Sequence, residues 1–283
     1  MVKQNYLSIY AKSFSWAGFF LPKKTYQECS SLYDFCRYVD NIADEQGDIE
    51  KKLVDLDHFQ SRFNSKESGD PIIKNIWEII EKYNISLKII NDLFDGVRSD
   101  LKNKVEINTR KDLLIYSYRV AGTVGLMMAK ILKVDRKESL KGAVDLGIAM
   151  QLTNISRDVI EDANSNRFYI SHSFEKIKET LETADLFYES CFSSIKDIPL
   201  RLRFSIIVAR RVYRKIGHNI LKKKNIENYN NSGKIYVTNI GKIIQTILSL
   251  YDLIRLSLIK PQDHLRYEEH QIINEEINLN ERL

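Results

Sequence analysis

Apolar residues recur at spacings of three and four along almost the whole chain, which is the period of an amphipathic helix. Residues that end helices and form tight turns are scarce, since the 283 residues include 11 glycines and 4 prolines. These features predict an all-α fold rather than many short strands. Besides a long helix that begins at about Tyr26, helices are expected at about 5–17, 48–65, 72–82, 85–101, 110–132, 136–162, 175–194, 199–224 and 238–258.

Composition narrows the class of protein. No internal repeat, low-complexity tract or linker marks a boundary, so one domain is expected over 1–283. The net charge of +5, without clustered arginines, predicts no nucleic-acid partner and a weak preference for anionic ligands. The 3 cysteines have no metal-ligand spacing, which fits the cytoplasm. Neither a signal peptide nor a membrane-spanning stretch is expected, so any membrane contact would be peripheral, at the inner face.

Two pairs of aspartates are spaced by four, which puts both carboxylates of a pair on one helical face. Such pairs are common on solvated surfaces, but Asp40 and Asp44 continue an apolar stripe, and Asp158 and Asp162 follow the apolar segment 143–152. Both pairs are therefore expected to point toward the core. Buried carboxylates need cations, and oxygen ligands select Mg²⁺ or Mn²⁺. An acidic cavity mouth with apolar walls suits a diphosphate ester that carries a hydrocarbon tail.

Four segments resemble the squalene and phytoene synthase family, and most closely its bacterial phytoene-forming members. They are Lys12–Ser15, Tyr33–Asp44 (YDFCRYVDNIAD), Tyr118–Met128 (YRVAGTVGLMM) and Gln151–Tyr169 (QLTNISRDVIEDANSNRFY), in the family's order. The last third of the chain matches only loosely. The resemblance implies an all-α isoprenoid synthase fold, a single helical bundle around a central cavity. Asn41 follows Asp40 where other enzymes of that fold carry DDxxD, as suits the head-to-head branch.

The resemblance also implies a reaction. Two molecules of geranylgeranyl diphosphate would condense head to head through prephytoene diphosphate to phytoene, with release of diphosphate, as a step of carotenoid biosynthesis. Mg²⁺ or Mn²⁺ would assist, and no NADPH is expected. One alternative is a squalene or dehydrosqualene synthase that acts on farnesyl diphosphate. Another is a non-catalytic helical assembly factor of the same fold, which the two intact aspartate pairs disfavour.

Roles for single residues follow from the resemblance and from side-chain chemistry. Metal coordination is expected from Asp40, Asp44, Asn154, Asp158 and Asp162. Catalytic roles are expected from these residues and from Gln151, Tyr116 and Tyr118, because aromatic rings attract cations. Substrate contacts are expected from Lys12, Ser13, Phe14, Gly18, Ser30, Arg37, Gly122, Val124, Gly125, Arg157, Tyr213 and Lys234.

Several of these residues also have structural interpretations. Arg157 could pair with the neighbouring aspartate instead of a phosphate. Gly122 and Gly125, inside a helical pattern, fit either close approach of substrate or tight helix packing. Each tyrosine could simply belong to the core. Lys234 stands where the family often has arginine, so it keeps the charge but loses the planar fork.

Two small residues bear on substrate length. Ser30 precedes Asp40 by ten residues, which is expected to place it about 15 Å along the helix and roughly on the same side as the carboxylates. Gly18 lies among large aromatic residues. Dehydrosqualene synthases, which take C15 substrates, carry bulky aromatic residues at the positions that we align with these two. The small residues therefore predict room for a C20 substrate. The alternative is that Gly18 caps a helix and Ser30 is a packing serine.

Overall fold

The structure is a computed structural model that describes residues 16–45, 47–260, 264 and 267–283. It confirms the all-α prediction, and the expected helix at 5–17 lies almost entirely outside the described residues. The helices are α3 (Lys23–Asp44), α4 (Ile49–Asn64), α5 (Pro71–Tyr83), α6 (Leu87–Ser99), α7 (Arg110–Ser117), η1 (Tyr118–Gly122), α8 (Thr123–Ile131), α9 (Lys137–Asn164), α10 (Phe174–Ser190), η2 (Ser193–Asp197), α11 (Leu200–Leu221), α12 (Ile226–Asn230), α13 (Asn239–Leu258), α14 (Glu268–Ile277) and η3 (Leu279–Glu281).

Helix ends follow local side-chain chemistry, as α5 illustrates. The Asp70 carboxylate accepts hydrogen bonds from the backbone N–H groups of Ile72 (2.8 Å) and Ile73 (3.3 Å). Pro71 occupies the first helical position, where no N–H donor is needed. The helix stops at Asn84, which adopts a left-handed conformation with φ of 48°. These few residues fix the length of α5 before any tertiary packing is considered.

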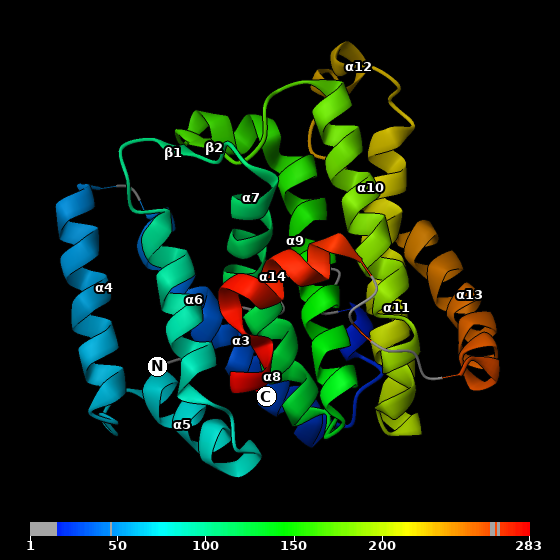
Figure 1. Ribbon diagram of the computed structural model, residues 1–283. Coiled ribbons are helices and arrows are strands. Elements are labelled where there is room, and N and C mark those ends of the chain that lie inside the picture. Colours follow the sequence, from blue (N-terminus) through cyan, green and yellow to red (C-terminus); the bar gives the residue numbers. More distant parts are fainter. Residues whose placement is uncertain (1–15, 46, 261–263, 265–266) are drawn as a thin grey trace.

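The 28-residue helix α9 is the centre of the bundle (Figure 1). It packs against α8 and η1 on one side and against α10, α11 and η2 on the other. Phe35, Phe59, Phe63 and Phe94 form an aromatic cluster that joins α3, α4 and α6. Because rings of this kind bury large apolar areas, the cluster fixes the position of α3 relative to its neighbours.

Residues 110–132, expected as one helix, are divided by the π-helical turn η1 between α7 and α8. Beyond the turn the chain crosses α9 at very short distance. A Cβ on Gly125 would lie 2.2 Å from the carbonyl oxygen of Ala143, and one on Gly147 would lie 2.2 Å from that of Ala121. Glycine is therefore required on both helices for the two backbones to touch.

The sequence did not predict the strands β1 (Val105–Glu106) and β2 (Arg167–Phe168), which pair in parallel. It also missed α12 and α14. The strands hold the loop after α9 against the end of α6, as Val105 N–H donates to Asn166 O at 3.0 Å. The two strands and α12, of two to five residues, give too few periods for pattern recognition, whereas α14, with ten residues, lies in the Glu-, Asn- and Gln-rich end of the chain and buries only a few side chains.

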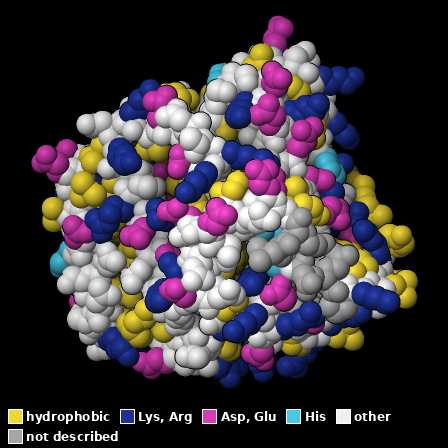
Figure 2. Space-filling model, in the orientation of Figure 1, with side chains coloured by type: hydrophobic (Ala, Val, Ile, Leu, Met, Phe, Trp, Pro, Cys, Tyr) yellow, Lys and Arg dark blue, Asp and Glu magenta, His cyan; other side chains and the backbone are white. Residues whose placement is uncertain are grey.

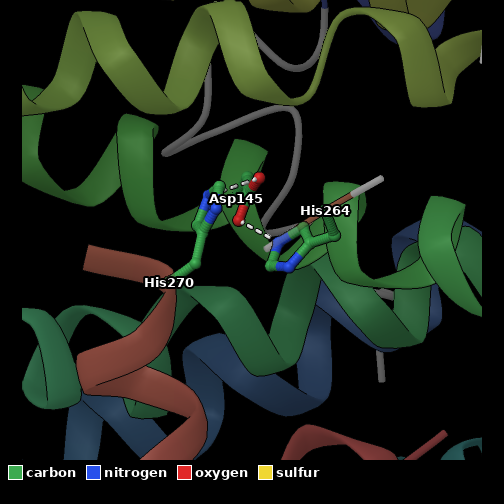
Figure 3. A group of neighbouring side chains, drawn as sticks. All are labelled: Asp145, His264 and His270. Carbon is green, nitrogen blue, oxygen red and sulfur yellow. Dashed lines mark hydrogen bonds and ion pairs between the residues drawn. The ribbon is translucent and has the colours of Figure 1, made fainter. Parts of the chain in front are cut away.

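The C-terminal segment is attached to α9 through a buried group, the histidine cluster of Asp145, His264 and His270 (Figure 3). His264 Nε2 lies 2.8 Å from Asp145 Oδ1, and His270 Nε2 lies 3.2 Å from Oδ2. Ser190 on α10 donates to the same carboxylate at 2.6 Å. Three separate segments are thus held together at one carboxylate.

Candidate active site

A cavity of about 810 Å³ runs between α3, α6, α8, α9, α11 and η2. Along α9 its lining extends from Asp162 back to Ser139, which is about 35 Å at 1.5 Å per residue. The aspartate end is polar, whereas the remaining walls are mostly apolar. The apolar lining includes Leu93, Val97, Val120, Met128, Leu132, Val134, Leu146, Met150, Ile195, Ile198 and Ile206.

Most of the predicted site residues line this one cavity. They come from α3, α7, α8, α9, α11 and the segment before α13, so the fold gathers residues far apart in sequence. The residues concerned are Arg37, Asp40, Asp44, Tyr116, Val124, Gly125, Gln151, Asn154, Arg157, Asp158, Asp162, Tyr213 and Lys234.

Both aspartate pairs point into the same end of the cavity, Asp40 and Asp44 from α3 and Asp158 and Asp162 from α9. Burial, together with the charge of Asp44, raises the pKa of Asp40 to about 7. Burial and the charge of Asp158 do the same for the pKa of Asp162, again to about 7. Although it lies deep in the protein, 42% of the Asp40 side chain is exposed within the cavity. Each of these two carboxyl groups thus lies in a partly desolvated site beside a second carboxylate, which disfavours its charged form unless a further cation is bound.

Cationic side chains lie among the aspartates. Arg37 bonds Asp40 at 2.6 Å and reaches Asp44 at 3.3 Å. Arg157 makes a two-point pair with Asp158, at 2.8 and 2.5 Å, which matches the ion-pair interpretation of this arginine. Lys234 lies 3.2 Å from Asp158. All three cations line the cavity, where a diphosphate would meet them.

Sequence reasoning missed Asp100, Tyr169 and Arg167, which also line the acidic end. The hydroxyls of Tyr116 and Tyr169 donate to the two oxygens of Asp100 at 2.7 and 2.9 Å, and their rings stack at 4.7 Å. Arg167, on β2, binds Asp44 on α3 at 2.7 Å. A lone aspartate at a helix end and a tyrosine in a loop carry no spacing signal, so only the fold brings them together.

Tyr118, for which a catalytic role was expected, does not line the cavity. Two residues along a helix turn the side chain by about 200°, so Tyr118 faces away from the cavity that Tyr116 lines. Its hydroxyl donates to Asp92 at 2.7 Å, in the buried interface with α6. Gly122 is also outside the lining, and its packing against Tyr118 and Val144 supports the tight-packing interpretation for this glycine.

Gly18 and Ser30 do not line the cavity either, so the predicted role of these residues at the end of the tail is wrong. Ten residues place Ser30 about 80° around the helix from Asp40, rather than on the same side. It is buried in the packing of α3. Gly18 packs on Tyr26, where a Cβ would lie 2.7 Å from the ring. Lys12, Ser13 and Phe14 lie outside the described residues.

The histidine cluster belongs to a different place from the cavity, because none of Asp145, His264 and His270 lines it. The Nδ1 atoms of both imidazoles are buried without a hydrogen-bond partner among the described residues. Metal-binding histidines usually donate that second nitrogen to an acceptor. The cluster therefore has the features of a structural hydrogen-bonded group rather than of the acidic site.

Known proteins similar in sequence to this chain belong to one enzyme family. A sequence model of the squalene/phytoene synthase family matches residues 7–174. The chain is 31% identical over 240 residues to a 15-cis-phytoene synthase of Paracoccus sp. (strain N81106 / MBIC 01143), which covers 75% of this chain and 79% of that protein. It is 29% identical over 248 residues to the 15-cis-phytoene synthase of Enterobacter agglomerans, covering 76% and 84%.

The solved structures that superimpose on this chain include a dehydrosqualene synthase and a squalene synthase. A dehydrosqualene synthase in complex with ligand superimposes with a TM-score of 0.73 at 25% identity, covering 88% of this chain and 94% of that one. A squalene synthase from Alicyclobacillus acidocaldarius, at 20% identity and a TM-score of 0.68, shares the fold. The isoprenoid synthase fold expected from the resemblance is thus confirmed. The chain belongs to the squalene/phytoene synthase family.

Proposed function

We propose that the chain condenses two molecules of geranylgeranyl diphosphate head to head to phytoene, through prephytoene diphosphate. The observation that carries the proposal is a long apolar cavity whose one end collects two aspartate pairs. A diphosphate with a hydrocarbon tail matches both halves of that cavity. Relatives of similar identity that are named phytoene synthases come from bacteria and from plants.

The donor set at the acidic end fits a hard divalent cation. Asp40, Asp44, Asp158 and Asp162 offer carboxylate oxygens and Asn154 an amide oxygen, the ligands that Mg²⁺ and Mn²⁺ prefer. The raised pKa values of Asp40 and Asp162 support a surplus of negative charge that a cation would neutralise. A bound metal ion would stabilise the charge that develops on the departing diphosphate.

The remaining steps depend on this chain's own side chains. Arg37, Arg157 and Lys234 are our candidates for binding the diphosphate oxygens. Tyr213 is our candidate for stabilising an allylic cation through its ring face, because burial raises its pKa and keeps the phenol neutral. Gln151 borders the reacting end of the cavity, and the apolar walls beyond it exclude water that would quench a cation.

A second candidate is a dehydrosqualene synthase that takes farnesyl diphosphate. The likeness to the solved dehydrosqualene synthase, which extends over 88% of this chain, favours it. Because Gly18 and Ser30 lie outside the cavity, their small side chains do not lengthen it for a C20 substrate. The C20 proposal therefore depends on the phytoene synthase relatives and on the length of the cavity.

Product analysis tests the proposal directly. Purified protein is incubated with C20 or C15 allylic diphosphate and Mg²⁺, with and without NADPH, and the hydrocarbons are identified. We expect phytoene from the C20 substrate, a higher kcat/KM for C20 than for C15, and no effect of NADPH. Preference for C15 would assign the dehydrosqualene reaction, and a more reduced product with NADPH would assign a squalene synthase. Asp158→Asn protein is the matched control for background chemistry.

A further inference from the structure

Helix α13 is amphipathic, but it turns its polar side toward the protein and its apolar side outward. Its buried positions are mostly polar, namely Lys242, Gln245, Ser249 and Asp252. Its outward positions are mostly apolar, and we call the following residues the α13 apolar face: Ile240, Ile243, Ile244, Ile247, Leu248, Leu250, Tyr251, Ile254 and Leu258. A helix that only covers the bundle would turn these two faces the other way.

Polar contacts hold the helix in this orientation. Arg211 on α11 pairs with Asp252 at 2.5 Å and reaches Gln245 at 3.3 Å. Trp16 Nε1 donates to Thr246 at 3.0 Å, on the flank of the helix. These contacts hold α13 on α11 without using the apolar face. Exposed isoleucines in such number indicate an interaction surface.

The shape and charge of the face favour a lipid surface over a second copy of the chain. The face spans about 160° of the helix, wider than the two-position seam of a coiled coil. The only acidic residue in Asn239–Leu258 is Asp252, which is buried. Arg255 and Lys260, at the C-terminal end, are exposed cations. Hydrophobic side chains line the edge of the molecule where Figure 1 places α13 (Figure 2).

The apolar part of the cavity lies directly behind this helix. Ile195 and Ile198, on and just after η2, line the cavity, and η2 packs against α13. Lys196 of η2 donates to the carbonyl oxygens of Ser257 and Ile259 at 3.0 and 2.9 Å. The short helix η2 thus contacts both the apolar part of the cavity and the C-terminal end of α13.

We propose that the α13 apolar face docks the protein on an anionic lipid bilayer, with the apolar end of the cavity toward the membrane. The face would enter the boundary between headgroups and acyl chains, while Arg255 and Lys260 meet anionic headgroups. Docking needs no turnover, so this surface can be tested without reference to the reaction proposed above.

Vesicle binding by charge variants is the first test. Ile247 and Ile254 are 61% and 64% exposed, and Val54 on α4, at the opposite edge of Figure 1, is 64% exposed. We expect wild-type protein to sediment with phosphatidylglycerol/phosphatidylcholine vesicles. Ile247→Glu/Ile254→Glu protein should lose at least about tenfold in partition coefficient, since each buried isoleucine contributes that much. Val54→Glu protein should bind as wild type, and the helical CD signal should stay intact in both. Equal binding by the double variant would overturn the proposal.

A fluorescent label identifies the occupant of the face. An environment-sensitive fluorophore is attached to Ile247→Cys protein, where the native thiols of Cys29, Cys36 and Cys191 are unreactive because burial raises the pKa of each. We expect a blue shift in emission only when anionic vesicles are added. A blue shift without vesicles that disappears on dilution would assign the face to a second copy. One that persists at every dilution would assign it to another part of the same chain, and either result rejects lipid docking.

Discussion

Truncation of Asp145 to alanine should destabilise the whole protein. The side chain is buried, and three groups lie at hydrogen-bond distance from its carboxylate: His264, His270 and Ser190 (Figure 3). Without the carboxylate these polar groups stay buried and lose their common acceptor, at about 1–3 kcal/mol each. Because such losses are not additive, we expect about 3–5 kcal/mol in total, a large part of a typical stability.

The pH at which to measure follows from the sign of the pKa shift. Burial alone would raise the pKa of Asp145, but His264 and His270 outweigh it and hold the pKa well below its usual range. A carboxyl group whose pKa is lower in the folded state stabilises the fold above its unfolded pKa of about 4. That stability is lost only as the pH falls through the folded pKa. Near neutral pH the whole contribution is therefore present.

Thermal unfolding followed by far-UV CD near neutral pH is the assay. For a chain of this size about 2 °C corresponds to 1 kcal/mol, so Asp145→Ala should lower Tm by about 6–10 °C. Ser190→Ala is the matched control, because it removes one donor and leaves both imidazoles paired with the carboxylate. It should lower Tm by about 2–4 °C. A Tm for Asp145→Ala within about 2 °C of wild type would refute the reasoning.

Three further predictions concern the cavity. Asp158→Asn should lower kcat at least about a hundredfold at saturating Mg²⁺ with an unchanged CD spectrum, and near-normal turnover would contradict the metal assignment. The pKa values of Asp40 and Asp162 are about 7 in the folded protein and about 4 in the unfolded chain. The folded, metal-free protein therefore binds more protons than the unfolded chain, and its stability falls as the pH rises through 7. Mg²⁺ should therefore raise Tm more at about pH 8 than at about pH 6, and an equal rise at both would count against a shared site. Gly147→Ala forces a Cβ to 2.2 Å from Ala121 O and should cost about 1–3 kcal/mol in unfolding free energy, whereas Gly69→Ala, with nothing closer than 3.9 Å, should be neutral.

Local spacing explains why half of the acidic site could be predicted. Two aspartates four residues apart share a face on any helix, so Asp40 with Asp44, and Asp158 with Asp162, needed no knowledge of the fold. The partners Asp100 and Tyr169 come from two other segments and meet Tyr116 only in three dimensions. Ser30 was misplaced because ten residues were taken to return it to the side of Asp40, whereas they leave it about 80° away.

Helix α13 illustrates a different limit. The sequence predicted its extent, 238–258, almost to the residue. Periodicity defines an apolar stripe but not whether the stripe faces the core or the outside. Here Arg211 on α11 decides the outcome, because its pairs with Asp252 and Gln245 turn the polar side inward. Long-range polar contacts thus contribute to which side of α13 faces outward.

The contact of η1 and α8 with α9 limits how this cavity can change during evolution. At this crossing the two backbones touch, and the wall of the cavity is formed by Ala121, Gly125, Ala143 and Gly147. A carbon atom added to either glycine would push the helices apart rather than narrow the cavity. Substitutions that tune substrate length must therefore accumulate on other walls, such as Leu93 on α6 or Ile206 on α11. Across a set of homologues, the residues at the crossing should remain small while the residues of the other walls vary. Differences in preferred substrate length would then come from substitutions on those other walls only.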